Sequence, residues 1–154
     1  MPTVYMMIGV PAAGKSTWLS QQDLDNAVVL STDNYVEHFA NLNNKTYTEM
    51  FKSVIGEATR LMQEDLRRAI QDQKDIFWDQ TNLTAKGRAG KLAQIPFTWK
   101  RVAVFFPTPS DEELKRRLAS RPGKMIPANV VLGMRSQLEA PSADEGFDSI
   151  IHVH

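Results

Sequence analysis

Short apolar runs alternate along the chain with longer segments in which apolar residues recur every three or four positions. Each run is almost continuously apolar, as expected of strands that are buried on both faces of a parallel sheet. The runs predict five β-strands, at residues 3–8, 28–31, 76–79, 101–106 and 149–153. The pattern therefore predicts a parallel sheet that is covered by helices on both sides.

The segments between these runs carry helical periodicity. The longest, from about residue 46 to 73, places Met50, Val54, Ala58 and Leu61 at three- and four-residue steps, so one face of this helix can pack on the sheet. Shorter helices are predicted from Thr17 onward and at residues 34–41, 84–95, 111–119 and 127–138. Strands and helices alternate throughout, which predicts one domain over residues 1–154 with a three-layer α/β/α fold and a five-stranded parallel sheet.

Composition narrows the class of protein. The 154 residues include no Cys, so the sequence predicts neither a disulfide framework nor a thiolate zinc site. The three His, at positions 38, 152 and 154, show no metal-ligand spacing. No apolar stretch is long enough to span a membrane, and the N-terminus does not resemble a signal region. We therefore expect a cytoplasmic protein that does not interact with membranes.

Charge is unevenly distributed although the net charge is zero. Residues 1–85 carry seven Lys/Arg and eleven Asp/Glu, whereas residues 86–135 carry eleven Lys/Arg and three Asp/Glu. Residues 136–154 carry four acidic side chains and no Lys or Arg. A protein that binds nucleic acid broadly is usually basic overall. One basic third in a neutral chain indicates a local anion site instead, although ordinary solvated helix faces account for part of this charge.

Residues 9–17 match a complete phosphate-binding loop. Gly9, Gly14, Lys15 and Ser16 meet the pattern G-x-x-x-x-G-K-[ST], between an apolar strand and the start of a helix. In such loops the backbone N–H groups point at a triphosphate, the lysine bridges the β- and γ-phosphates, and the hydroxyl contacts Mg²⁺. The sequence therefore predicts binding of ATP with Mg²⁺. The residues expected at the nucleotide are Gly9, Ala12, Ala13, Gly14, Lys15, Ser16 and Thr17.

Asp33 directly follows the second predicted strand. A carboxylate at this end of the sheet can face the γ-phosphate from the acceptor side and accept the proton of an attacking hydroxyl. Asp is also a preferred N-cap, so Asp33 could simply begin the helix at residues 34–41. The sequence alone leaves both interpretations open.

The third predicted strand ends in another polar segment, at residues 79–82. Asp79 can hold a water of the Mg²⁺ shell, and Thr81 and Asn82 offer neutral polar groups to an acceptor. The alternative is that Thr81 or Asn82 caps the helix that follows.

A basic run lies near the predicted end of the helix at residues 111–119. Arg117 and Arg121 are four positions apart and would share a helical face if the helix extended that far. Their guanidinium groups, beside a Pro-Gly segment that reads as a mobile loop, are suited to close over a triphosphate and stabilise charge on a migrating phosphoryl group. For Lys115 and Arg116 a solvated position is expected, and it is the alternative for Arg121.

Together these segments resemble the polynucleotide kinase branch of P-loop kinases. The resemblance rests on residues 9–18, 32–35, 79–83 and 117–127, and the tail at residues 137–147 is similar to that of animal end-repair relatives. It implies a P-loop kinase fold with a short lid, Lys15 and Ser16 at ATP and Mg²⁺, Asp33 as general base, Arg121 as the lid arginine and Thr81 on the acceptor side. The acceptor implied is the 5′-hydroxyl end of DNA or RNA.

One position departs from this family. In phage-type enzymes an arginine three residues after the base contacts the 3′-phosphate of the acceptor, and here that position is Val36. Two other functions therefore stay open. One is a kinase of a small molecule or nucleotide. The other is a non-catalytic ATP-binding module, like the P-loop domain of nuclear ribonucleoproteins with a similar Asp-Gln-Thr-Asn segment. The sequence does not indicate an oligomeric state.

Overall fold

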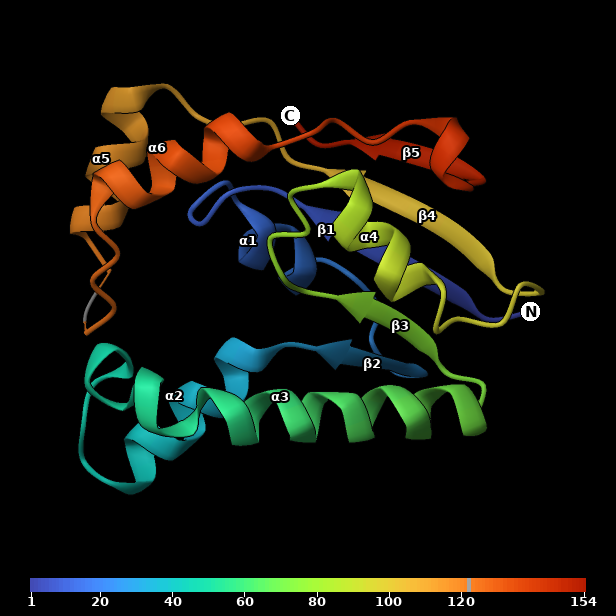
Figure 1. The fold of residues 1–154 in the computed structure, drawn as a ribbon, viewed down its shortest axis with the longest axis horizontal. Helices are drawn as coiled ribbons and strands as arrows, with labels where there is room; N and C mark the ends of the chain where they lie inside the picture. The colour runs from blue at the N-terminus through green and yellow to red at the C-terminus, as the bar shows by residue number, and fades with distance from the viewer. Residues whose placement is uncertain (122) are drawn as a thin grey trace.

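The computed structural model describes residues 1–121 and 123–154, so Pro122, within the predicted mobile loop, lies outside the described residues. Strands and helices alternate as the hydrophobic pattern predicts (Figure 1). In chain order the elements are β1 (Thr3–Ile8), α1 (Lys15–Ser20), β2 (Ala27–Leu30), α2 (Thr32–Leu42), α3 (Tyr47–Gln71), β3 (Asp75–Trp78), α4 (Ala85–Leu92), β4 (Lys100–Phe105), α5 (Asp111–Ala119), α6 (Ala128–Gln137), the 3₁₀-helix η1 (Ala143–Glu145) and β5 (Ser149–His152).

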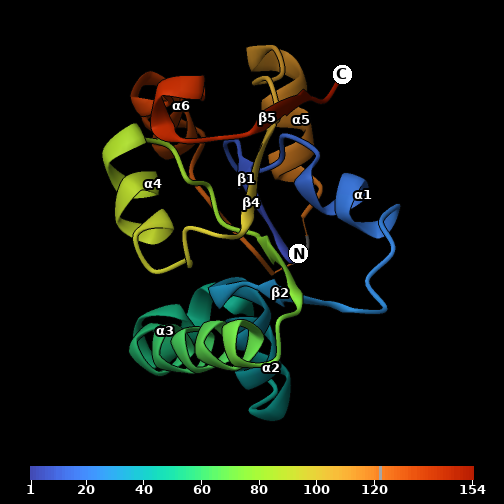
Figure 2. The same ribbon diagram turned by 90° about the vertical axis from the view of Figure 1, so that its right-hand side faces the viewer.

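The five strands form one parallel sheet in the order β2-β3-β1-β4-β5. β1 is central, with Val4 opposite Ile76 of β3 and Arg101 of β4. Figure 2 shows α1 and α5 on one side of the sheet and α3, α4 and α6 on the other. The predicted three-layer α/β/α fold with a five-stranded parallel sheet is therefore confirmed.

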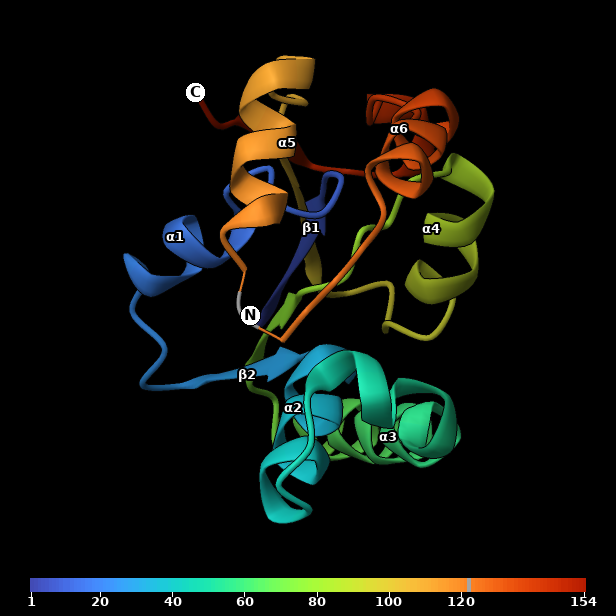
Figure 3. The ribbon, with the colours of Figure 1, turned by 90° about the vertical axis from the view of Figure 1, so that its left-hand side faces the viewer.

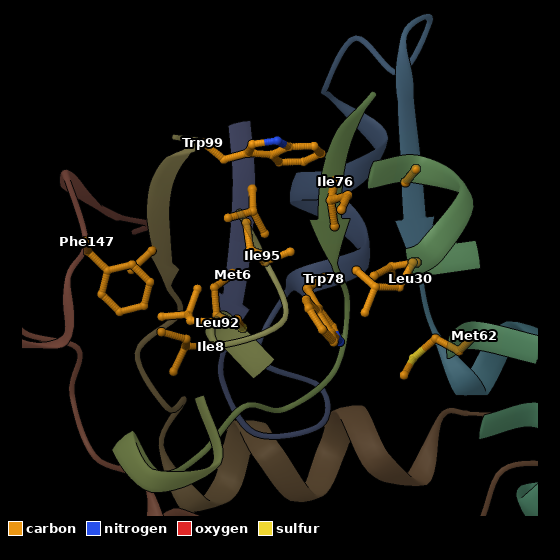
Figure 4. Packing of buried hydrophobic residues seen from close by; sticks show 14 residues of the cluster. Met6, Ile8, Leu30, Met62, Ile76, Trp78, Leu92, Ile95, Trp99 and Phe147 are labelled. Atoms are coloured by element: carbon orange, nitrogen blue, oxygen red, sulfur yellow. The ribbon is translucent and has the colours of Figure 1, made fainter. Parts of the chain in front are cut away.

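Alternate residues of each strand enter different cores, because successive side chains of a strand point to opposite faces. Val4, Met6 and Ile8 of β1 pack with residues of α3 and α4, whereas Met7 packs with Phe77 and Trp18 on the α1 face. Figure 4 shows the first of these clusters, in which Trp78 and Leu30 lie between the sheet and Met62 of α3. Both faces of β1, β3 and β4 are largely buried, which explains their nearly continuous apolar runs, whereas β5 at the edge of the sheet is mostly exposed.

Two predicted helix caps differ from those observed. Ser31, not Asp33, caps α2, because its hydroxyl accepts a hydrogen bond from the Asn34 N–H at 3.2 Å. The helix begins earlier than predicted, so Asp33 lies in its first turn. Likewise Thr84 caps α4, and the alternative that Thr81 or Asn82 does so is wrong. With the cap supplied by Ser31, the position of Asp33 needs another explanation.

A buried ion pair attaches the C-terminal tail to the body of the domain. Arg88 of α4 is fully buried and donates to Glu145 of η1 from Nε at 2.7 Å and Nη2 at 3.0 Å. Its Nη1 donates to the carbonyl oxygens of Asn82 and Leu83. One guanidinium thus joins the tail to the loop between β3 and α4.

Throughout residues 1–121 and 123–154, none of the helices combines the length and the apolar character that crossing a membrane requires.

Candidate nucleotide and phosphoryl-acceptor site

All five strands end at one large cavity. Its volume is about 1360 Å³, and its lining includes the loop after β1, the start of α2, the residues after β3, the Pro107–Pro109 segment after β4 and the chain end after β5. In parallel α/β folds, ligands bind at the carboxyl ends of the strands. In Figure 1 these ends face the left side of the molecule, where the connection between α5 and α6 approaches α2 and α3.

The loop at residues 9–14 has the backbone of an anion cradle. Ala12 and Gly14 have positive φ values of 67° and 102°, which turn the chain sharply. A Cβ on Gly9 would lie 2.9 Å from Cβ of Phe106, so only glycine fits where the loop leaves β1. Within the described residues, several N–H groups of this segment donate to no protein acceptor: those of Ala12, Gly14, Lys15, Ser16 and Thr17. Unpaired N–H groups beside a cavity favour an anionic ligand.

Lys15 begins α1 and turns its ammonium group back onto the loop. Its Nζ donates to the carbonyl oxygens of Gly9 at 2.7 Å and Val10 at 3.0 Å. Burial lowers the pKa of Lys15 to about 8, although the negative charges of Asp79 and Asp33 oppose this shift. An anion in the cavity would compensate a charge that the protein itself only partly compensates.

Ser16 and Asp79 line the same cavity and are the residues predicted to meet a metal ion. Burial raises the pKa of Asp79, with Lys15 opposing the shift. No group of three or more His, Cys, Asp or Glu that could hold a metal occurs among the described residues. A hydroxyl and one carboxylate suit Mg²⁺, which usually keeps water ligands and binds together with substrate phosphates. The donor set therefore fits Mg²⁺ that arrives with a nucleotide.

Arg117 and Arg121 both line the cavity but do not share a helical face, because α5 ends at Ala119. Arg117 holds the loop from outside: its Nη1 donates to the Ala12 carbonyl at 2.9 Å and its Nε to Glu113 at 2.8 Å. In contrast, Nη1 of Arg121 is buried and has no hydrogen-bond partner among the described residues. A buried guanidinium nitrogen without an acceptor, beside the loop, fits a phosphate oxygen.

Asp33 faces the cavity with both carboxylate oxygens engaged. The Tyr47 hydroxyl donates to Oδ1 at 2.6 Å, and Nζ of Lys124 donates to Oδ2 at 3.0 Å. Burial alone would raise the pKa of Asp33, but these hydrogen bonds and the positive charges of Lys124 and Arg121 bring it below its usual value. Asp33 is therefore an ionised carboxylate at neutral pH, at the edge of the cavity opposite the loop.

The segment after β3 divides into two parts. Thr81 lines the cavity, and its carbonyl accepts from the Gly9 N–H at 3.0 Å. Asn82 is buried, and its amide nitrogen lies within hydrogen-bond distance of the carbonyl oxygens of Met7, Trp78 and Gln80. The prediction that Asn82 offers a polar group to an acceptor is therefore wrong, because its amide is used to hold the ends of β1 and β3 together.

Sequence reasoning missed Tyr47 and the role of Lys124. Tyr47 is the first residue of α3, directly after Thr46, whose capping box with Glu49 fixes the start of this helix. The threonine and glutamate three positions apart signal that start. Nothing local indicates that Tyr47 meets Asp33, since α2 and a turn separate them.

Val36 is fully buried on the inner face of α2, along with Thr32 and Ala40. This position faces the core and does not line the cavity. The sequence position at which phage-type polynucleotide kinases carry an arginine is thus a core position of α2 in this protein.

Comparison with known proteins identifies the family. The sequence profile described as AAA domain matches residues 4–141. The chain belongs to this AAA domain family. Among curated proteins, the AAA domain described here is 22% identical over 160 residues to the mouse (Mus musculus) protein "Heterogeneous nuclear ribonucleoprotein U-like protein 2". The match covers 97% of this chain but 21% of that protein, so the chain spans about one fifth of the length of this relative.

Solved structures share the fold. A protein of Chloroflexus aurantiacus assigned as a kinase superposes with a TM-score of 0.68 at 18% identity, covering 99% of this AAA domain and 87% of that chain. A chain of the Pnkp1/Rnl/Hen1 RNA repair complex gives 0.66 at 21% identity, covering 96% of this chain and 46% of that one. A gluconokinase of Sinorhizobium meliloti gives 0.51 at 14% identity over 99% and 82%. The fold is thus that of P-loop kinases.

Proposed function

We propose that this AAA domain is an ATP-dependent kinase that transfers the γ-phosphoryl group to the 5′-hydroxyl end of DNA or RNA. One observation carries the proposal: an ionised carboxylate, Asp33, faces the same cavity as a phosphate-binding loop with unpaired N–H groups. Donor loop and acceptor base at opposite edges of one cavity form the arrangement that phosphoryl transfer to a hydroxyl requires.

On the donor side, the chain supplies charge and orientation. The N–H groups from Ala12 to Thr17 and the Lys15 ammonium bind the phosphates, and Nη1 of Arg121 meets the charge that spreads over the transferring group. Arg117 keeps the loop in place through the Ala12 carbonyl. Ser16 and Asp79 would hold Mg²⁺, which would neutralise charge on the donor phosphates.

On the acceptor side, the attacking hydroxyl takes the place of one of the two donors on Asp33. Its proton moves to the carboxylate as the new P–O bond forms, and the bond between the γ-phosphorus and the β–γ bridging oxygen breaks, with ADP leaving. Thr81, at the cavity wall between Gly9 and Asp79, contacts the acceptor in this proposal.

The nucleic-acid acceptor is favoured by two comparisons, the RNA repair complex and the ribonucleoprotein relative. The second of these also motivates another candidate function, a non-catalytic ATP-binding module. We favour catalysis because Lys15, Ser16, Asp33 and Arg121 all line one cavity. The gluconokinase fold neighbour motivates a third candidate, a small-molecule kinase.

The deciding experiment offers γ-labelled ATP and Mg²⁺ to the protein with a panel of acceptors. The panel contains 5′-hydroxyl single strands and duplex ends of DNA and RNA, with 3′-hydroxyl or 3′-phosphate, and a matched set of nucleosides and sugars. We expect label on 5′-hydroxyl ends, with the 5′-phosphorylated strands as blanks. Label on sugars alone would establish the small-molecule kinase, and ATP binding without transfer to any acceptor would establish the binding module.

A further inference from the structure

A short segment on the C-terminal side of Pro122 is attached to the first turn of α3. The Gly123 carbonyl accepts from the Thr48 N–H at 3.3 Å, and the Met125 N–H donates to the Thr48 hydroxyl at 2.9 Å. Gly123 has a φ of 68°, and a Cβ there would lie 3.3 Å from Cβ of Thr46. Figure 3 shows the chain from residue 123 onward passing near α2 before it rises to α6. The segment at residues 123–125 is therefore held in a defined position on α3.

The side chain of Lys124 reaches from this segment to Asp33, at the edge of the cavity where the acceptor is proposed to bind. Its side chain is 11% exposed, with Nζ 3.0 Å from Oδ2 of Asp33 and 4.5 Å from the ring centroid of Tyr47. A second carboxylate, Glu37, lies 3.9 Å away. A lysine held by two carboxylates and an aromatic face contributes more than an exposed ion pair, because its ammonium is largely removed from water.

The same segment includes the donor-side arginine. Arg121 lies three positions before Lys124, so the two Cα atoms are at most about 11 Å apart along the chain. Nη1 of Arg121 is buried without a partner among the described residues, so no protein acceptor there fixes this nitrogen, although the Arg121 N–H donates to the Leu118 carbonyl at 3.4 Å. The backbone of Arg121 is thus held by the end of α5 on one side and by its covalent link to the segment at residues 123–125 on the other.

We propose that Lys124 is a positioning residue that couples the two halves of the site. By binding Asp33 it holds the segment at residues 123–125 in place on α3, and this attachment directs Arg121 toward the donor phosphates. The inference rests on the proposed function for its effect on turnover, but its effects on ATP binding and on Asp33 do not need an acceptor. A merely structural lysine would stabilise the fold without linking Arg121 to Asp33.

The coupling is tested by a double-mutant cycle on ATP affinity, measured calorimetrically with Mg²⁺ and no acceptor. We expect Lys124→Met to weaken ATP binding several-fold in the wild-type background and to change it less than twofold in an Arg121→Ala background. Lys124→Arg should retain most of the ATP affinity, because it keeps a positive charge beside Asp33. Lys45→Met is the matched control, since this lysine lies just before the cap of α3 and does not line the cavity.

A second measurement follows Asp33 itself. Its surroundings contain charged or titratable groups from every adjacent element: Lys15, Glu37, Tyr47, Asp79, Arg121 and Lys124. Removal of the Lys124 ammonium removes a cause that lowers the Asp33 pKa, so this pKa should rise in Lys124→Met. Carboxyl-carbon NMR titration measures it directly, and the acid limb of the kcat/KM profile, which reports the free protein, should also move to higher pH.

The effect on kcat distinguishes a lysine that positions Arg121 from a lysine that blocks Asp33. If Lys124 positions Arg121, Lys124→Met lowers kcat about 10- to 100-fold, as expected when a charged group near the reaction is displaced by about 1 Å. A higher kcat would mean that the ion pair blocks the base, and equal losses of ATP affinity in both backgrounds would mean that Lys124 acts independently of Arg121. Either result overturns the proposal.

Thr48→Val provides a second route if Lys124→Met folds poorly. It removes the hydroxyl that accepts from the Met125 N–H while it leaves Lys124 in place. The coupling requires a smaller loss of ATP affinity in the same direction, again absent in the Arg121→Ala background. An unchanged ATP affinity in Thr48→Val would refute it. If wild-type protein phosphorylates no 5′-hydroxyl end, the proposed function fails, but this cycle still decides the coupling.

Discussion

The two halves of the cavity differ in how far the protein satisfies its own polar groups. On the donor side, five N–H groups from Ala12 to Thr17 and Nη1 of Arg121 have no partner among the described residues. On the acceptor side, both oxygens of Asp33 are bonded, to Tyr47 and Lys124. Apart from Lys15, whose Nζ donates to the Gly9 and Val10 carbonyl oxygens, the donor half can receive an anion without breaking an internal bond, whereas the acceptor half must exchange one internal partner for substrate. Discrimination between acceptors should therefore depend on Asp33 and its two donors.

The largest effect should come from removing the base. We predict that Asp33→Asn slows phosphoryl transfer at least about 100-fold, because an amide cannot accept the hydroxyl proton. It should melt near the wild-type temperature, since Ser31 caps α2 and the amide oxygen of an asparagine can still accept a hydrogen bond from Lys124. Single-turnover rates with γ-labelled ATP and thermal melts measure the two quantities. Near-normal transfer would mean that the acceptor half binds substrate but does no proton chemistry.

Next in size is the loss of the unpaired donor-side cation. Arg121→Ala should lower kcat by about 10²–10³, the range seen when one donor to developing charge is removed. Arg116→Ala is the matched control, because its guanidinium is 71% exposed and bonds to Glu113 of its own helix. We expect that variant to stay within about twofold of wild type in steady-state assays. Equal losses from both would show that the basic run acts as a diffuse anion surface.

A smaller effect concerns the pH dependence of ATP affinity. The pKa of Lys15 is lowered to about 8, and a bound triphosphate favours the protonated form, so ATP binding above pH 8 takes up a proton. Affinity should therefore fall as pH rises from 8 toward 10, by up to about tenfold per unit. Calorimetry in buffers of different ionisation enthalpy measures the uptake.

Lys15→Met should abolish this proton uptake. Lys91→Met is the control, because burial also lowers the Lys91 pKa to about 8 but its ammonium bonds to Gln80 and lies outside the cavity lining. Uptake that persists in Lys15→Met would assign the proton to another group.

The smallest predicted effect separates capping from catalysis. Ser31→Ala removes the cap of α2 and should lower the free energy of unfolding by about 1 kcal/mol, measured by urea denaturation. Phosphoryl transfer should change little, since Asp33 keeps Tyr47 and Lys124. If transfer falls as far as in Asp33→Asn, the start of α2, rather than the carboxylate, determines the rate.

The features that the sequence predicted well depend on neighbouring residues. Apolar runs located the strands, and the Gly and Lys spacing located the loop, because both patterns act within about ten residues. Asn82 was misassigned because its amide pairs with Met7, 75 positions away. The end of α5 at Ala119 was predicted correctly, but the Lys124 contact with Asp33 spans 91 positions. These features arise from tertiary packing, which no local pattern encodes.

The buried Arg88–Glu145 pair has a consequence for the cooperativity of the domain. Arg88 is fully buried and binds the carbonyl oxygens of Asn82 and Leu83 as well as Glu145. If the tail detached, it would leave this guanidinium charge without its carboxylate in an apolar interior. Opening of the tail alone would therefore cost substantial free energy. The tail and the β3–α4 loop should therefore open as one unit, and their amide hydrogens should exchange together. Because this loop also carries Thr81, a disturbance at the C-terminal end of the chain would reach the wall of the cavity.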